Sequence, residues 1–143
     1  MPFVIRRLPL CLALIALPAL AQPRFSCVGA EKLEEDVFSI AFPRGGAQIT
    51  EAARSPLAAA IEAALAEPDR NICILGHAGQ EGGANTSIQL AAQRARAVHN
   101  AMAAKGVGAE RLRAEARSAQ FSPAVRAAEP PSRTVTIVLM PPP

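Results

Sequence analysis

Aromatic side chains are scarce in this sequence of 143 residues, which contains five Phe and neither Trp nor Tyr. Proteins that stack on nucleic-acid bases need aromatic rings, and the basic residues here form no block, so nucleic-acid binding is not expected. Only two histidines and three cysteines occur, and their spacing fits no metal site. No Ser-His-acid or Cys-His pattern stands out either. We therefore expect no metal, no cofactor and no enzymatic activity.

A long apolar run occurs at the N-terminus. Residues 1–21 contain two arginines, the run LPLCLALIALPAL and a final Ala-Leu-Ala, which is the pattern of a secretory signal peptide. The alternative, a membrane anchor, is disfavoured because Pro9 and Pro18 interrupt a run too short for a bilayer core of ~30 Å. Cleavage before Gln22 lowers the formal charge from +3 to +1, since 13 basic and 12 acidic residues remain. We expect a periplasmic protein with no stable membrane anchor.

Two cysteines remain after this cleavage, Cys27 and Cys73. Exported proteins meet an oxidising compartment, where these two can form a disulfide. A free Cys73 would instead serve as a small apolar residue in a buried strand. Both possibilities remain open from the sequence.

The chain is organised around residues 71–106. The apolar run 72–75, closed by Gly76, is typical of a buried strand. A glycine-rich loop, 79–84, comes next, and a helix follows in which Thr86 and Gln89 can form a capping box and Gly106 can end the helix. Its apolar stripe at helical spacing consists of Ile88, Ala91, Ala95, Val98 and Met102.

Further strands are expected at 37–42, 111–117 and 133–140, and a further helix at 50–66. Residues 119–132 contain three prolines and read as a loop, with one helical turn possible at 123–128. Two stripes are expected to face the core: Phe38, Ile40 and Phe42 on the first strand, and Ala53, Leu57, Ile61, Ala64 and Leu65 on the first helix. The pattern predicts an α+β fold with two helices on one side of a four-stranded mixed sheet.

Eight residues in unbroken register carry a resemblance to a known family: Gly76, His77, Leu90, Arg94, Ala95, Val98, Lys105 and Gly106. They resemble the OmpA-like peptidoglycan-binding domain, whose motif reads roughly G-H-T-D, a loop, N-x-x-L-S-x-x-R-A, V and K-G. The resemblance implies a β-α-β-α-β-β sandwich over residues 37–140. A lead of residues 22–36 precedes it, and a proline tail of residues 141–143 follows.

As the resemblance implies, the ligand is the diaminopimelate of a peptidoglycan stem peptide, which carries an ammonium and a carboxylate on one carbon. Arg94 would take the carboxylate bidentately, and we expect it to point away from the apolar stripe. The family aspartate falls on Gly79, so the acid is missing unless Glu81 replaces it. His77 and Ser87 complete the expected ligand-binding set. The alternative is a degenerate domain that binds another envelope protein or has a structural role.

Overall fold

The computed structural model describes residues 24–79, 83–118 and 133–143, without the side chains of residues 84–86. The strands are β1 (Val37–Ala41), β2 (Ile72–His77), β3 (Leu112–Arg117) and β4 (Thr134–Leu139). The main helices are α1 (Glu51–Ala66) and α2 (Ala84–Ala104), and two short 3-10 turns are η1 (Ala30–Lys32) and η2 (Ala109–Arg111). The expected signal peptide, Glu81 and the expected helical turn at 123–128 lie outside the described residues.

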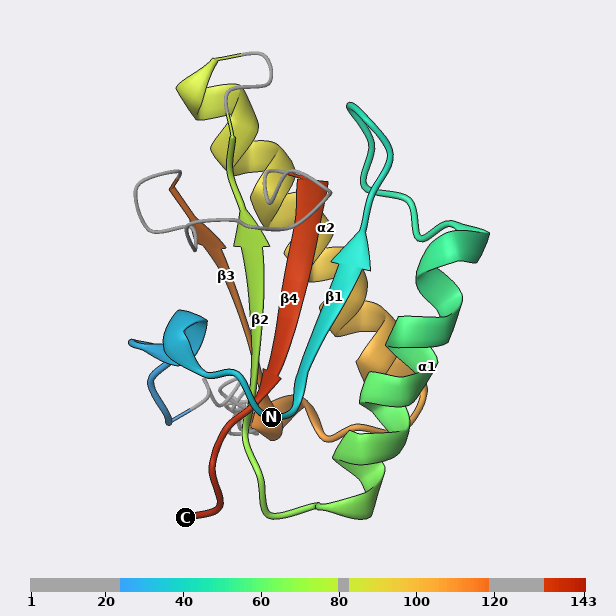
Figure 1. The fold of residues 1–143 in the computed structure, drawn as a ribbon, viewed down its shortest axis with the longest axis vertical. Helices are drawn as coiled ribbons and strands as arrows, with labels where there is room; N and C mark the ends of the chain where they lie inside the picture. Colours follow the sequence, from blue (N-terminus) through green and yellow to red (C-terminus); the bar gives the residue numbers. More distant parts are fainter. Residues whose placement is uncertain (1–23, 80–82, 119–132) are drawn as a thin grey trace, which may run out of the picture.

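The four strands form one mixed sheet in the order β1-β4-β2-β3. Strand β4 is antiparallel to β1 and to β2, whereas β2 and β3 are parallel. Both helices cover the same face, with α1 beside β1 (Figure 1) and α2 in contact with β2 and β3. The predicted order of elements and the sandwich of two helices on a mixed sheet are confirmed.

The core between sheet and helices is made of aliphatic side chains and alanines. It includes Ile40, Ile72, Ile74, Val135, Ile137 and Leu139 from the sheet and Ala53, Leu57, Ala60, Ala64, Ala95, Val98 and Met102 from the helices. Helix α2 lies very close to β2 at Gly76. A Cβ atom built there would be 2.1 Å from the backbone oxygen of Ala91, so the sheet and the helix can meet at this distance only if residue 76 is glycine.

Two details of the predicted α2 are wrong. The helix begins at Ala84 after Gly83, whose φ is 91°, so Thr86 lies inside the helix and cannot be its N-cap. Ile88 is 40% exposed, because the first turns of α2 project beyond the ends of the strands, where no sheet lies beneath them (Figure 1).

One position in α1 is also predicted wrongly. Leu65 is 49% exposed, and Ala60 is buried in its place. The buried residues follow the spacing 53, 57, 60, 64, and each residue advances the helix by about 100°, so residue 65 is turned away from the sheet. The helix begins after Thr50, as expected, but the Thr50 side chain makes no capping hydrogen bond.

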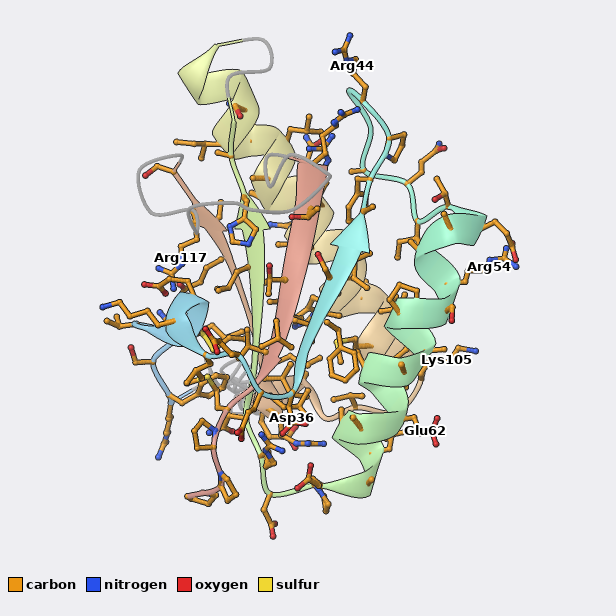
Figure 2. The ribbon with its side chains drawn as sticks, in the orientation of Figure 1. Asp36, Arg44, Arg54, Glu62, Lys105 and Arg117 are labelled. Carbon is orange, nitrogen blue, oxygen red and sulfur yellow. A yellow bond between two sulfur atoms is a disulfide. The ribbon has the colours of Figure 1, made fainter. Side chains whose placement is uncertain are left out.

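The lead before β1 covers the face of the sheet that carries no helix. Cys27 and Cys73 form a disulfide with an S–S distance of 2.03 Å, and both are buried in a small second core with Leu75 and Val138. Arg117 of β3 also holds the lead, since its Nη2 donates to the carbonyl of Cys27 at 2.8 Å. Figure 2 shows Arg117 on this side, beside the lead. The sheet therefore has a covered surface on both faces.

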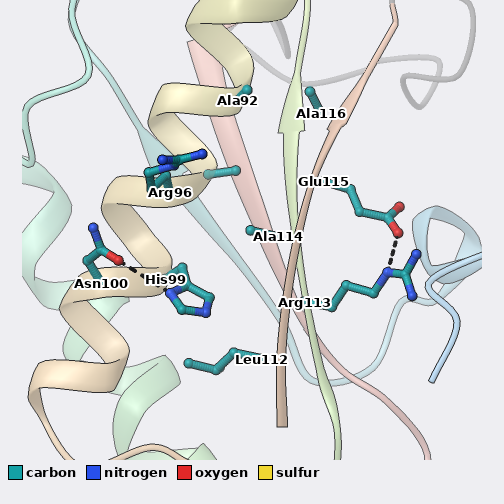
Figure 3. A pocket seen from close by; sticks show the side chains of 10 residues that line it. Ala92, Arg96, His99, Asn100, Leu112, Arg113, Ala114, Glu115 and Ala116 are labelled. Atoms are coloured by element: carbon teal, nitrogen blue, oxygen red, sulfur yellow. Dashed lines mark hydrogen bonds and ion pairs between the residues drawn. The ribbon is translucent and has the colours of Figure 1, made fainter. Parts of the chain in front are cut away.

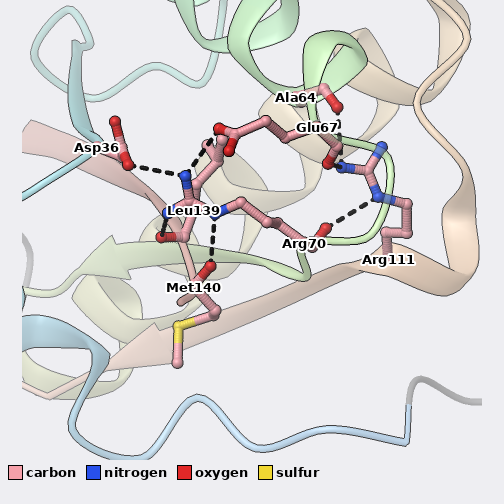
Figure 4. Close-up of polar contacts among 7 residues, drawn as sticks. All are labelled: Asp36, Ala64, Glu67, Arg70, Arg111, Leu139 and Met140. Carbon is pink, nitrogen blue, oxygen red and sulfur yellow. Dashed lines mark hydrogen bonds and ion pairs between the residues drawn. The ribbon is translucent and has the colours of Figure 1, made fainter. Parts of the chain in front are cut away.

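A buried arginine ties the other end of the sheet together (Figure 4). Arg70 donates from Nη1 to Asp36 and to Glu67, both at 2.8 Å. Its Nε and Nη2 donate to the carbonyls of Met140 and Leu139. These bonds link the end of α1, the start of β2, the start of β1 and the end of β4.

Within the described part of the chain, no helix combines the length and the apolar character needed to cross a bilayer.

Candidate functional site

The candidate ligand-binding residues lie at the end of the sheet opposite Arg70, where the strands β1 and β2 end in loops. This end is called the loop-bearing edge. Strands β1 and β2 run in the same direction, because each is antiparallel to β4, so their C-terminal ends lie at one edge. The loop 42–50 after β1, the residues after β2 and the first turns of α2 meet there (Figure 1). In sheets covered by helices, this kind of edge is where ligands usually bind.

Arg94 lies at the base of this edge, and it is 1% exposed. Its Nε donates to the carbonyl of Gly46 at 2.8 Å and its Nη2 to the carbonyl of Pro43 at 2.9 Å. The guanidinium carbon is 5.8 Å from the centre of the Phe42 ring, within the range of a cation–π contact. Arg94 thus fixes the loop between β1 and α1, and Figure 2 shows Arg44 at the tip of that loop.

The expected direction of Arg94 is wrong. The residue follows Ala91 by three positions and precedes Val98 by four, and such residues share one face of a helix. Arg94 therefore points into the protein beside the apolar stripe, and its long side chain ends under the β1–α1 loop rather than in solvent. The periodicity of apolar residues did not reveal the inward direction of Arg94, because a buried charge does not contribute to an apolar stripe.

Ser87 organises the second loop of this edge. Its Oγ accepts a hydrogen bond of 2.6 Å from the backbone N–H of Gly79, and the residue is 4% exposed. Ser87 thus fastens the chain leaving β2 to the start of α2. Gly79 contributes a backbone N–H here and has no side chain that could receive an ammonium group.

His77 lies on the other side of the sheet. Side chains alternate along β2, so Gly76 faces α2 whereas Leu75 and His77 face the lead. The ring is 2% exposed, and Nε2 is 2.7 Å from Oγ1 of Thr136. Burial lowers the pKa of His77, and the positive charge of Arg117 lowers it further. The structure therefore brings together Arg94, Ser87 and Gly79 at one edge but separates His77 from Arg94 by the sheet.

The structure adds three residues that sequence reasoning missed at this edge: Phe42, Pro43 and Gly46. Two of them act through backbone carbonyls, which no side-chain pattern reveals. The available signal was the Pro-Arg-Gly-Gly segment directly after a strand, which is typical of a loop. The resulting arrangement is a positive charge held in a fixed position at the base of two loops, which suits an anionic group better than a catalytic step.

Comparisons with known proteins agree with this architecture. The OmpA family model matches residues 41–135. The peptidoglycan-associated lipoprotein from Burkholderia pseudomallei is similar in structure, with a TM-score of 0.62 and 21% identity over 72% of this chain and 90% of that one. The OmpA-like domain of FopA1 from Francisella tularensis has a TM-score of 0.63 and 14% identity over 77% of each chain.

The cell wall anchor of the T6SS from Pseudomonas aeruginosa is also similar, with a TM-score of 0.54 and 24% identity over 72% of this chain and 79% of that one. No curated protein matches the chain significantly. The structural similarities at these identities show the fold, and the family model covers about two thirds of the sequence, including β2, all of α2 and Arg94. The chain belongs to the OmpA family.

Proposed function

We propose that this chain is a periplasmic, non-catalytic module of the cell envelope that binds peptidoglycan non-covalently through the diaminopimelate of a stem peptide. Membership of the OmpA family supports the proposal. So do the similar structures, one of a peptidoglycan-associated lipoprotein and one of a cell wall anchor.

One observation carries the proposal: the guanidinium of Arg94 is held in place at the loop-bearing edge of the sheet. Its bonds to the carbonyls of Gly46 and Pro43 fix its plane before any ligand arrives. A guanidinium whose orientation is fixed loses little entropy when it takes a carboxylate. Diaminopimelate offers such a carboxylate.

The ammonium group on the same carbon of diaminopimelate has a weaker counterpart in this chain. Gly79 stands where the family has aspartate, and a hydrogen bond to a charged group contributes about 1.5–3 kcal/mol. Its loss corresponds to a roughly ten- to hundredfold lower affinity. The alternative is that Glu81, two residues further on, replaces this acid. We propose weak binding, with Arg94 as the main contact and Ser87 holding the loop that carries Gly79.

The proposed periplasmic location draws support from the covalent structure. Disulfides persist mainly in exported proteins, and Cys27 and Cys73 are bonded here. The proposed signal peptide at residues 1–21 would deliver the chain to that compartment.

A second function has its own support. Arg94 is 1% exposed, and two of its N–H groups are already bonded to loop carbonyls. This is the arrangement of an arginine that stabilises a loop. If that is its whole role, the chain is a structural or protein-binding OmpA-like module of the envelope that does not bind peptidoglycan.

The two functions are separated by co-sedimentation of the mature protein, residues 22–143, with purified sacculi. Under the proposal the protein sediments with sacculi, and free diaminopimelate releases it. Arg94→Lys keeps the charge but loses the planar two-bond contact, so it should lower binding at a temperature where its circular dichroism shows it folded.

The matched control is Arg96→Lys, the same change at an exposed position two residues along α2. It should bind like the wild type. Sedimentation of the wild type no greater than that of an unrelated periplasmic protein would exclude peptidoglycan binding and favour the second function.

A further inference from the structure

The outer edge of β3 has no neighbouring strand in the described part of the chain. Strand β3 stands last in the sheet order and pairs with β2 alone. Edge strands carry a row of unpaired N–H and C=O groups, which can receive another strand. Such an edge is usually protected when it is not used for binding.

The backbone groups that face outward can be identified from the register. The N–H of Ala78 donates to the carbonyl of Arg117, and His77 is opposite Arg117 in a parallel pair. Alternate residues of a strand direct their N–H and C=O to the same side. Residues 113, 115 and 117 therefore bond to β2, and the N–H and C=O groups of Ala114 and Ala116 point outward.

A groove lies directly beside these outward groups. It has a volume of about 460 Å³ and runs between α2 and β3 (Figure 3). Its floor consists of small or aliphatic side chains, namely Ala92, Ala95, Leu112, Ala114 and Ala116. Ala114 is exposed, although its side chain faces the helix, because alanine is too short to fill the space between strand and helix.

The charges around the groove are mainly positive. Arg96 stands on its α2 side (Figure 3) and is exposed, and no acidic group of the described residues contacts it. On the opposite face of β3, Arg113 and Arg117 both pair with Glu115 and donate to carbonyls of the lead, and Glu31 lies on the same face beside His77. The positive charge open to an added strand therefore lies on the helix side, at Arg96.

We propose that the outer edge of β3 binds an extended, acidic peptide segment of a partner protein by strand addition. The peptide backbone bonds to the outward groups of Ala114 and Ala116. Every second side chain enters the groove against α2, where Arg96 can pair with an acidic neighbour, and the remaining side chains face the lead. Main-chain bonds give affinity in this mode, and the groove selects alternate side chains. The small floor favours residues of the size of valine.

This outer side of β3 is separate from the loop-bearing edge that carries Arg94, so the inference does not depend on peptidoglycan binding. A protein-binding surface at this place is compatible with either proposed function.

The test uses a short, capped peptide of alternating valine and glutamate and the mature protein labelled with ¹⁵N. Binding should shift the amide resonances of residues 112–117 and slow hydrogen exchange at Ala114 and Ala116. Two control peptides isolate the contributions: one with N-methylated amides, which cannot form the ladder, and one with lysine in place of glutamate. Neither should bind to a comparable extent.

Two variants test the groove itself. Ala92→Leu fills the groove from α2 and should weaken binding at least fivefold, whereas Gln93→Leu adds the same side chain at the next exposed position and should not. Arg96→Glu should weaken binding of the glutamate peptide about two- to fivefold, in line with a single exposed charge pair. Arg54→Glu, on the exposed side of α1, is its control.

Three results would overturn the inference: absence of shifts at residues 112–117 with the glutamate peptide, equal binding of the N-methylated peptide, or unchanged binding by Ala92→Leu. Sacculus binding measured on the same variants keeps the two sites distinguishable. Ala92→Leu should leave sacculus binding unaltered. A loss of sacculus binding in Arg94→Lys alone would therefore concern the proposed function and not the outer edge of β3.

Discussion

Replacing Gly76 by alanine is expected to destabilise the protein strongly, although alanine is better suited than glycine to the interior of a strand. The added Cβ would lie 2.1 Å from the backbone oxygen of Ala91 and 2.9 Å from its carbonyl carbon. Ordinary contact begins at 3.4 Å, so the first distance is too short by 1.3 Å. A backbone atom inside a helix cannot rotate away, and α2 as a whole must shift.

Forcing one extra carbon into a packed core typically costs about 1–3 kcal/mol, and more where the backbone has to move. We expect a loss of about 3 kcal/mol in the free energy of unfolding for Gly76→Ala. For a chain of this length such a loss lowers the melting temperature by about 10 °C. The measurement is a thermal melt followed by circular dichroism, together with urea unfolding.

Gly108 provides the matched control. A Cβ there would lie 2.2 Å from Oε1 of Glu110, but this is the end of an exposed, flexible side chain that can rotate away. Gly108 has φ −60° and ψ 129°, which alanine adopts readily, and glycine-to-alanine changes at such positions stabilise by about 0.4–1 kcal/mol. A melting temperature of Gly76→Ala within about 2 °C of the Gly108→Ala value would show that the reasoning about close packing is wrong.

Two further predictions concern the face of the sheet that carries no helix. The Cys27–Cys73 disulfide closes a loop with a sequence separation of 46, so its reduction should lower the free energy of unfolding by about 4 kcal/mol in the chain-entropy model. Denaturant unfolding curves with and without reductant measure this difference, and coincident curves would contradict it. The folded-state pKa of His77 is below its ordinary value of 6.5, so the unfolded chain binds more protons as the pH falls through 6.5, and the stability should decrease there. His77→Gln should flatten the pH dependence of the unfolding free energy below pH 6.5, and an unaltered slope would show that His77 is not its source.

Much of the fold follows from short-range sequence patterns. The apolar strand at 72–75, the alternation of Phe38, Ile40 and Phe42, and the helical spacing of Ala91, Ala95, Val98 and Met102 all correspond to buried faces in the structure. These patterns are informative because a strand and a helix each expose a fixed side to the core. The predictions failed where the end of an element extends past its neighbours, as at Ile88.

Arginines that donate to backbone carbonyls account for most of what the sequence did not predict. Arg70, Arg94 and Arg111 each donate to backbone carbonyls of loops or of element ends. An arginine has a long apolar stem and five donors in a planar fork, so it can reach carbonyls that only the folded chain brings together. No local pattern distinguishes these residues from exposed arginines such as Arg54 and Arg96. The family resemblance selected Arg94 as a ligand contact, whereas the apolar stripe gave the wrong direction for its side chain.

The central proposal is that Arg94 and the loop around Gly79 form a site for diaminopimelate that lacks its acid. Its most direct test is calorimetric titration of a stem peptide containing diaminopimelate into the wild type and into Gly79→Asp, after a melting curve has shown that the variant is folded. We expect weak binding by the wild type and an affinity at least about tenfold higher for Gly79→Asp, because the restored carboxylate would contribute a charge-assisted hydrogen bond to the ammonium. A folded Gly79→Asp protein that binds no better than the wild type, with neither showing measurable heat, would contradict the proposal and leave the structural or protein-binding function in its place.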